Sequence, residues 1–181
     1  CADYSWSVFE NIIVGGRTDS LGNLACQSGG GFFITVGAYP DVGDTSLERN
    51  NLVQHNKAYY NFGGGFAIDT VAHPILMGNR IFNNRAGDRS PWQYTDTTIA
   101  DGGGIGIDST NPVIQYNWII DNFSADEGGG VSSKNSWGTI DHNTIALNDA
   151  FNDGAGVRFA GFYKPVFTNN NIVCYGPWES S

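Results

Sequence analysis

Three charged residues occupy the same position in three similar strings of this 181-residue chain. Asp69, Asp108 and Lys134 are each the seventh residue of a string that begins with three glycines. If these strings are neighbouring strands, the three side chains stand side by side at a spacing of about 4.8 Å. Carboxylates that close together raise the pKa of one of them, which suits proton transfer, and a nearby lysine could act as a base. We therefore predict that Asp69, Asp108 and Lys134 are catalytic residues. The alternative is a solvated corner in which Asp is present because it favours the turn.

A second set of acidic residues comes just before the glycines of three strings. Asp101, Glu127 and Asp153 hold this position, and Asp126 is adjacent. Acids on successive strands repel one another unless a cation or solvent relieves them. Hard oxygen ligands of this kind suit calcium. We predict Asp101, Glu127 and Asp153 as metal ligands and calcium as the cofactor, with an acidic, well-hydrated edge as the alternative.

Between these two sets, the strings carry small residues where a substrate could lie. Small residues expected to face outward are Ala67, Gly104, Gly106 and Ser132. They would leave a shallow trough, which Trp92 and Tyr94 of the insertion at residues 85–100 could overhang and Arg158 could close at its far end. Aromatic rings beside polar groups are typical of sugar sites. We predict Trp92, Tyr94, Ser132 and Arg158 as substrate-binding residues; alternatively, the insertion packs onto the trough.

The element that must position these side chains is the glycine string. Five strings begin at Gly29, Gly63, Gly102, Gly128 and Gly154. Alternation along a strand predicts that the fourth and sixth residues of each string face the core. These residues are Phe32, Phe66, Ile105, Val131 and Val157, followed by Ile34, Ile68, Ile107, Ser133 and Phe159. One string supplies one strand, so a stack of strings forms a sheet.

A second repeated string lies between the glycine strings and is clearest at residues 113–122. Its relatives lie at residues 7–16, 47–56, 75–84, 139–148 and 166–175. Each copy has two short apolar runs around a central asparagine: Asn11, Asn51 (with Asn50 as a rival), Asn79, Asn117, Asn143 and Asn170. Asparagine tolerates the left-handed backbone of a one-residue corner, and its amide can bond to the turn above. Three strands per turn of about 26 residues predict a coil of parallel β-structure.

These two strings together resemble the right-handed parallel β-helix proteins of the pectate-lyase-like superfamily. The resemblance implies an all-β, three-sheet solenoid of about six turns, with an asparagine ladder at the corner between the second and third sheets. It also implies an active cleft on the sheet of glycine strings. Residues 1–181 then form a single domain. No N-terminal amphipathic helix caps the open end of the coil and both ends resemble ordinary turns, so we expect the chain either to be a segment of a longer coil or to abut another protein.

The catalytic strings of particular enzymes in that superfamily are missing from this sequence. The Asn-Thr-Asp, Asp-Asp and Gly-His-Gly set of polygalacturonases is absent, and so is the Asp-Pro-His-Glu string of alginate epimerases. The resemblance therefore specifies a fold and leaves the reaction open.

Composition narrows the choice of partner. The chain has 9 Lys and Arg against 18 Asp and Glu, for a net charge of −9. Such a field disfavours nucleic acid and anionic membranes, and no apolar run is long enough to span a bilayer. His55, His73 and His142 lack metal-ligand spacing, and we interpret them as surface or corner residues. Cys1, Cys26 and Cys174 allow one disulfide or simple buried thiols, and Cys1 could also be a lipidated terminus.

Two functions follow from these observations. The first is an extracellular or cell-surface β-helix that binds a polysaccharide along the sheet of glycine strings. If the protein is an enzyme, it would also cleave this polysaccharide, as a lyase or a glycoside hydrolase. The second is a structural or adhesive module whose coil ends stack into a rod or filament. Fold alone does not choose between them.

Overall fold

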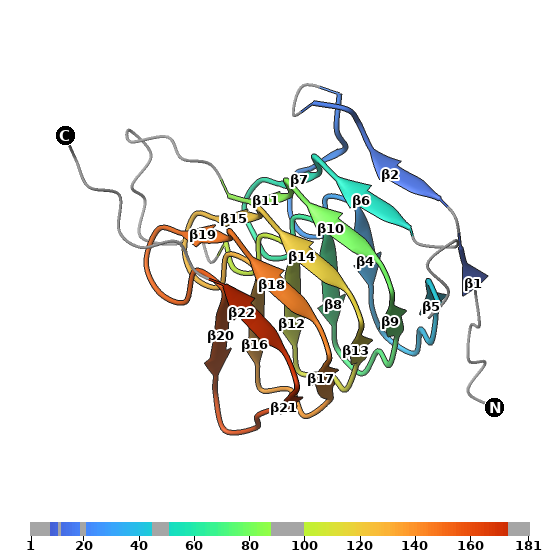
Figure 1. The fold of residues 1–181 in the computed structure, drawn as a ribbon, viewed down its shortest axis with the longest axis vertical. Helices are drawn as coiled ribbons and strands as arrows, with labels where there is room; N and C mark the ends of the chain where they lie inside the picture. The colour runs from blue at the N-terminus through green and yellow to red at the C-terminus, as the bar shows by residue number, and fades with distance from the viewer. Residues whose placement is uncertain (1–7, 11, 19–20, 45–50, 88–99, 174–181) are drawn as a thin grey trace.

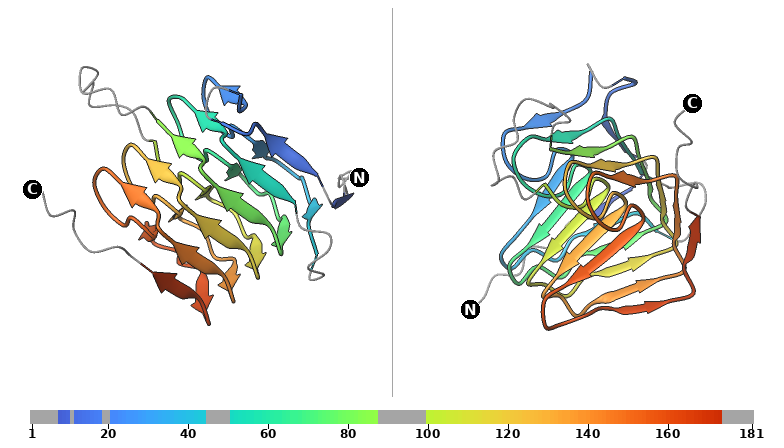
Figure 2. Two further views of the ribbon diagram at one scale, coloured as in Figure 1. Left: turned by 45° about the horizontal axis from the view of Figure 1, so that its top comes forward. Right: turned by 90° about the vertical axis from the view of Figure 1, so that its left-hand side faces the viewer.

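The computed structural model describes residues 8–10, 12–18, 21–44, 51–87 and 100–173. Trp92, Tyr94, Asn11, Asn50 and the cysteines Cys1 and Cys174 lie outside these residues. Within them the chain folds into short strands, β1 to β22, without a helix, and Cys26 is an exposed free thiol. The strands wind into a coil in which each turn lies on the one before it (Figures 1 and 2).

The strands form four sheets, and every pairing within them is parallel. The glycine sheet holds β4 (Phe32–Ile34), β8 (Phe66–Asp69), β12 (Ile105–Asp108), β16 (Val131–Lys134) and β20 (Val157–Ala160). The second sheet holds β1 (Val8–Phe9), β5 (Asp41–Val42), β9 (Ile75–Met77), β13 (Val113–Gln115), β17 (Thr139–Asp141) and β21 (Val166–Thr168).

The other two sheets complete each turn. The third sheet holds β2 (Ile13–Gly15), β6 (Leu52–Gln54), β10 (Arg80–Phe82), β14 (Trp118–Ile120), β18 (Thr144–Ala146) and β22 (Asn171–Val173). The short sheet holds β3 (Leu24–Ala25), β7 (Lys57–Ala58), β11 (Arg85–Ala86), β15 (Phe123–Ser124) and β19 (Asp149–Ala150). In Figure 1 the third sheet lies in front of the glycine sheet, with the second sheet at the lower edge and the short sheet at the upper edge.

The predicted all-β parallel β-helix is confirmed, with one more strand per turn than the sequence predicted. The additional strands belong to the short sheet, and each is only two residues long. Two residues cannot show an alternating pattern, so these segments resemble turns in the sequence.

The predicted core positions are confirmed. Phe66, Ile68, Ile105, Ile107 and Val131 are at most 3% exposed, and they belong to one cluster that also includes residues of the second and third sheets. Phe32 stacks on Phe66 with 4.8 Å between ring centroids. Because each turn lays its apolar residues on those of the next, the turns stabilise one another.

The predicted asparagine ladder is present between the second and third sheets. Each Nδ2 donates to the Oδ1 of the next turn, from Asn51 through Asn79, Asn117 and Asn143 to Asn170, at 2.9–3.0 Å. The structure also contains a second ladder, between the third and short sheets, that the sequence reading missed. It runs through Asn23, Asn56, Asn84, Asn122 and Asn148 at 3.0–3.1 Å.

At most of the described corners the left-handed residue is the one before the ladder asparagine, and not the ladder asparagine itself, contrary to our prediction. Tyr116, which precedes Asn117, has a φ of 57°, and Asp121, which precedes Asn122, has a φ of 56°. Asn117 and Asn122 have ordinary backbone angles, and their amide groups bond to carbonyl oxygens of the preceding turn. The corner therefore uses two residues, one for the bend and one for the ladder.

The glycines allow the backbones of consecutive turns to approach each other closely. A Cβ on Gly104 would lie 2.7 Å from the Gly130 carbonyl oxygen and 3.1 Å from Nδ2 of Asn122, so Gly104 points into the coil and not outward as predicted. The first glycine differs, because Gly102 has a φ of 70° that disfavours a side chain.

Candidate functional site

The three predicted catalytic residues lie in one row at the end of the glycine sheet. Asp108 pairs in register with Asp69 on one side and with Lys134 on the other, which confirms that they are neighbours. Each carboxylate accepts a hydrogen bond from the residue after it, at 2.7 Å from Thr70 Oγ1 to Asp69 and at 2.8 Å from Ser109 Oγ to Asp108. Lys134 is exposed, and none of the described ion pairs joins it to Asp108.

The predicted trough is filled where the structure describes it. Ala67 is fully buried, Ser132 is 2% exposed and Gly106 is buried. Phe62 and Gly63, which come just before the preceding glycine strand, lie over Gly106, where a Cβ would be 2.8 Å from the Gly63 nitrogen. Ser132 therefore offers almost no surface to a ligand, and the outer face of the glycine sheet is covered in the middle of β8, β12 and β16, whereas Phe33 of β4 is exposed.

The accessible surface lies instead in the post-strand loops, the segments that lead from the glycine sheet to the second sheet. These loops are residues 35–40, 70–74, 109–112, 135–138 and 161–165. Backbone hydrogen bonds stack them: Ser109 donates to Lys134 at 3.0 Å and Trp137 donates to Thr110 at 3.2 Å. The Phe162 amide donates to Oδ1 of Asn135 at 3.1 Å. The loops thus form a continuous ridge beside the row of Asp69, Asp108 and Lys134.

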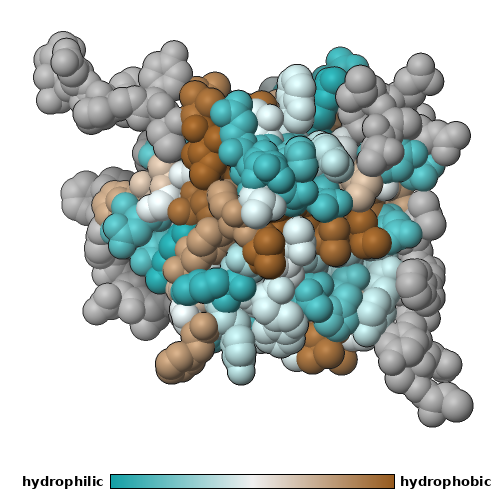
Figure 3. Space-filling view, turned by 60° about the horizontal axis from the view of Figure 1, so that its bottom comes forward, coloured by the Kyte–Doolittle hydropathy of each residue, from teal (hydrophilic) through white to brown (hydrophobic). Residues whose placement is uncertain are grey.

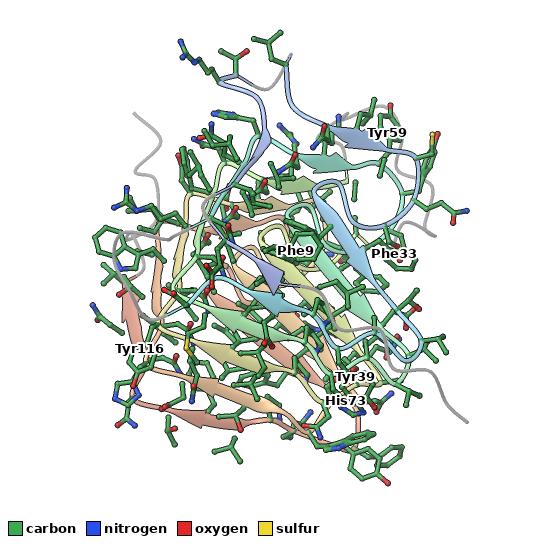
Figure 4. The ribbon with its side chains drawn as sticks, turned by 90° about the vertical axis from the view of Figure 1, so that its right-hand side faces the viewer. Phe9, Phe33, Tyr39, Tyr59, His73 and Tyr116 are labelled. Atoms are coloured by element: carbon green, nitrogen blue, oxygen red, sulfur yellow. The ribbon has the colours of Figure 1, made fainter. Side chains whose placement is uncertain are left out.

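Aromatic rings meet at both ends of this ridge. Trp137 and Tyr163, which are 49% and 60% exposed, contact edge to face with 5.4 Å between ring centroids. Tyr39 and His73 contact at 5.0 Å, and Figure 4 shows them together at one corner of the coil. With this edge turned forward, apolar groups form a band that crosses the face between polar ones (Figure 3).

Sequence reasoning missed this aromatic ridge, although a signal was present. Trp137 and Tyr163 are each the tenth residue of their glycine strings. Parallel stacking in register brings equal positions of consecutive strings together, as it does for Asp69 and Asp108. The side-chain positions predicted to face outward cover only the first seven residues of each string and do not include the loops.

Two of the three predicted metal ligands come together, with a different third residue. Asp101, Asp126 and Glu127 place their carboxylate oxygens within 4.8 Å of one another. Asp153 is exposed and lies outside this group. Arg158, predicted to close the trough, reaches these acids: its Nη2 pairs with Glu127, and its Nη1 lies 3.6 Å from Oδ2 of Asp101. The four residues form a charged cluster at the entry to the glycine sheet.

Asp101 has an unusual environment within this charged cluster. Its side chain is 8% exposed, and its Oδ1 atom is buried without a hydrogen-bond partner. Burial is the main cause that raises the pKa of Asp101 to about 6, and the negative charge of Asp126 adds to it. The positive charge of Arg158 acts in the opposite direction.

A further polar group lies at the corner between the second and third sheets. His142 Nδ1 is 2.6 Å from Asp141 Oδ2, and its ring stacks against Tyr116 with 5.1 Å between centroids. Hydrogen bonds from Thr168 and then from His142 are the main causes that lower the pKa of Asp141 to about 2. We interpreted His142 as a corner residue, and these contacts place it at such a corner.

Comparison with known proteins adds one finding. The family model described as "Right handed beta helix region" matches residues 23–174. No curated protein and no solved structure matches the chain. Among the described residues, no helix is long and apolar enough to cross a membrane.

Proposed function

Because the chain belongs to the right-handed β-helix family, we propose that it uses the outside of its coil to bind an extended polymer. The proposed ligand is a polysaccharide outside the cell or at its surface. It would lie along the post-strand loops, beside the row of Asp69, Asp108 and Lys134. The net charge of −9 favours a neutral or weakly charged glycan over a polyanion.

The exposed pair of Trp137 and Tyr163 carries this proposal. Flat aromatic rings contact the apolar faces of sugars while neighbouring polar groups bond to the hydroxyls. Here the rings come from two consecutive turns, and Asn135, Ser109 and Thr70 provide polar groups along the ridge. From the first to the fifth loop the ridge spans four spacings of about 4.8 Å, which suits an oligosaccharide segment.

Asp69, Asp108 and Lys134 would provide the acid–base chemistry if the bound chain is cleaved. A carboxylate and an amine at adjacent strand positions can take a proton from one atom and give it to another. A hydrolase, which suits a neutral glycan, needs one carboxylic acid and one carboxylate. A lyase removes a proton beside a carboxyl group, so it would need a weakly charged glycan that contains acidic sugars. Lys134 is exposed at the end of β16, where it can reach a ligand on the loops.

A binding panel of neutral and acidic polysaccharides tests the proposal. Trp137→Ala should weaken binding of the preferred glycan about tenfold or more, because it removes the exposed ring. Trp118→Ala is the matched control, since Trp118 is 54% exposed but lies on the third sheet. Equal losses in the two variants, or no binding by the wild type to any glycan, would contradict this function.

A product assay tests the chemistry separately from binding. With a glycan that binds, Asp108→Asn and Lys134→Ala should reduce turnover about a hundredfold or more while Kd changes little. If the wild type binds the glycan without any turnover, the protein is a carbohydrate-binding module and the catalytic assignment is wrong.

End-to-end stacking remains a second candidate because of the last described turn. All three residues of β22 are exposed, including Ile172 and Val173, and Val166 of β21 is 57% exposed. Strands at the edge of a sheet offer unpaired backbone groups to another chain. Light scattering over a range of concentrations tests this candidate: growing assemblies would support it, and a constant monomer mass would count against it.

A further inference from the structure

The charged cluster of Asp101, Asp126, Glu127 and Arg158 has more negative than positive charge. Three carboxylates place their oxygens within 4.8 Å of one another, and one guanidinium is paired with two of them. Carboxylates this close repel strongly, and the repulsion grows as water is removed. A single Arg158 therefore leaves the group short of positive charge.

One oxygen of this cluster lacks a partner. Asp101 as a whole is only 6% exposed, and its Oδ1 atom is buried and makes no hydrogen bond. A buried carboxylate oxygen normally accepts hydrogen bonds or binds a metal, because its desolvation is otherwise uncompensated. The unpartnered Oδ1 thus indicates a ligand in addition to Arg158, and it is an observation separate from the grouping of the acids.

We propose that Asp101, Asp126 and Glu127 bind a divalent cation of the calcium type, and that the Arg158 guanidinium takes its place when the cation is absent. Arg158 is 27% exposed at its side chain, so it has room to move away from the acids. A divalent ion would replace one positive charge with two and give Asp101 Oδ1 a partner.

The donor set fits calcium better than a transition metal. All three side chains offer oxygen, which hard cations prefer, and calcium accepts irregular arrangements with added water. Asp126 and Glu127 are partly exposed, so water can complete the coordination. Asn152 Nδ2 donates to Oδ1 of Asp126 at 2.6 Å and fixes that carboxylate from the next turn.

The site would also have a structural effect, independent of whether the protein binds carbohydrate. Glu127 accepts a backbone hydrogen bond from Gly102 at 3.0 Å, and Arg158 belongs to β20. A cation held by Asp101, Asp126 and Glu127 would therefore join two consecutive turns at the entry to the glycine sheet. An ion that binds the folded state alone stabilises it, by an amount that grows with the logarithm of the ion concentration above Kd.

Calorimetric titration of the chelator-treated wild type with Ca²⁺ tests the proposal. We expect saturable binding of one ion with a Kd of roughly 10⁻⁴–10⁻³ M, as in other calcium sites with few ligands. Glu127→Gln and Asp126→Asn should each weaken it about tenfold or more, because each removes a charged ligand. Asp108→Asn removes a carboxylate elsewhere on the coil and should leave the Kd unchanged.

Arg158→Gln tests the competition directly. Without the guanidinium, Ca²⁺ should bind about tenfold more tightly, because the ion no longer displaces a positive charge. The melting temperature of the wild type should rise with millimolar Ca²⁺ and fall back with chelator, a readout that needs no variant. The absence of saturable binding in the wild type, an equal loss in Asp108→Asn and Glu127→Gln, or an unchanged Kd in Arg158→Gln would overturn the proposal.

Discussion

The indole ring of Trp137 meets the phenol ring of Tyr163 edge to face, with 5.4 Å between their centroids and 67° between their planes. The two residues are 26 positions apart and hold equal places in consecutive turns. The stacking of turns thus places residues that are far apart in the sequence side by side on the surface, as it also does for Asp69 and Asp108.

The aromatic pair should contribute modestly to folding and strongly to glycan binding. In a double-mutant cycle with Trp137→Ala and Tyr163→Ala, we expect a coupling of about 0.5–1.5 kcal/mol in the free energy of unfolding. Urea unfolding of the four proteins measures this term. A coupling near zero would show that the rings do not hold each other in solution.

The asparagine ladders should be worth more than any surface contact. Asn122→Ala removes the amide that donates to the Ile81 carbonyl at 2.9 Å and to Asn148 Oδ1 at 3.0 Å. It also removes Oδ1, which accepts hydrogen bonds from the backbone amide of Asn84 at 3.0 Å and from Asn84 Nδ2 at 3.1 Å. Because these groups are buried, we expect a loss of about 2–4 kcal/mol in the free energy of unfolding. Urea unfolding measures the loss, with the exposed Asn171→Ala as the control. Similar losses in the two variants would contradict a buried ladder.

The third glycine of a string should tolerate a methyl group less well than a glycine in open space. In Gly104→Ala the new Cβ would meet the Gly130 carbonyl and the Asn122 amide, neither of which can move far. Gly37→Ala adds only backbone strain, because Gly37 has a φ of 72° and nothing within 4 Å of its Cβ position. We expect about 1 kcal/mol for Gly37→Ala and at least about twice that for Gly104→Ala. Thermal and urea unfolding rank the variants, and the reverse order would contradict the close packing.

The coil was predictable from the sequence because glycines and asparagines recur at equivalent positions in every turn. A single recurring position, such as the fourth residue of each string, predicts both the sheet and its core. The short sheet and the second ladder were harder to find. Asn84, Asn122 and Asn148 were visible at the ends of the repeated strings, but without the two-residue strands after them nothing indicated a corner there.

The candidate site was less predictable because it depends on side-chain directions in loops. The register of Asp69, Asp108 and Lys134 followed from the repeat alone. By contrast, the burial of Gly106 depends on how the segment at Phe62 folds over the sheet, which no periodic pattern specifies. The direction of Arg158 was set by the acids one and two turns away, a long-range attraction that string positions do not reveal.

The stability of the protein should respond to the ionisation of Asp101. Its folded-state pKa is about 6, against an ordinary value of 3.8, so the folded state binds more protons than the unfolded state between these values. The stabilising contribution of protonated Asp101 is therefore fully present below about pH 4 and is lost as the pH rises through 6. The difference of about two pKa units corresponds to roughly 3 kcal/mol.

Urea unfolding of the wild type and of Asp101→Asn at pH 4.5 and pH 7, both with chelator, measures this contribution. Asp126 and Glu127, from the loop after β15, and Arg158, from β20, are the charged groups that face Asp101 among the described residues. We expect the wild type to lose stability relative to Asp101→Asn between the two pH values. Asp141 does not interfere, because its pKa of about 2 confines its effect to lower pH. Parallel pH profiles for the two proteins would show that Asp101 titrates normally, and the charge imbalance in this cluster would then be relieved by water.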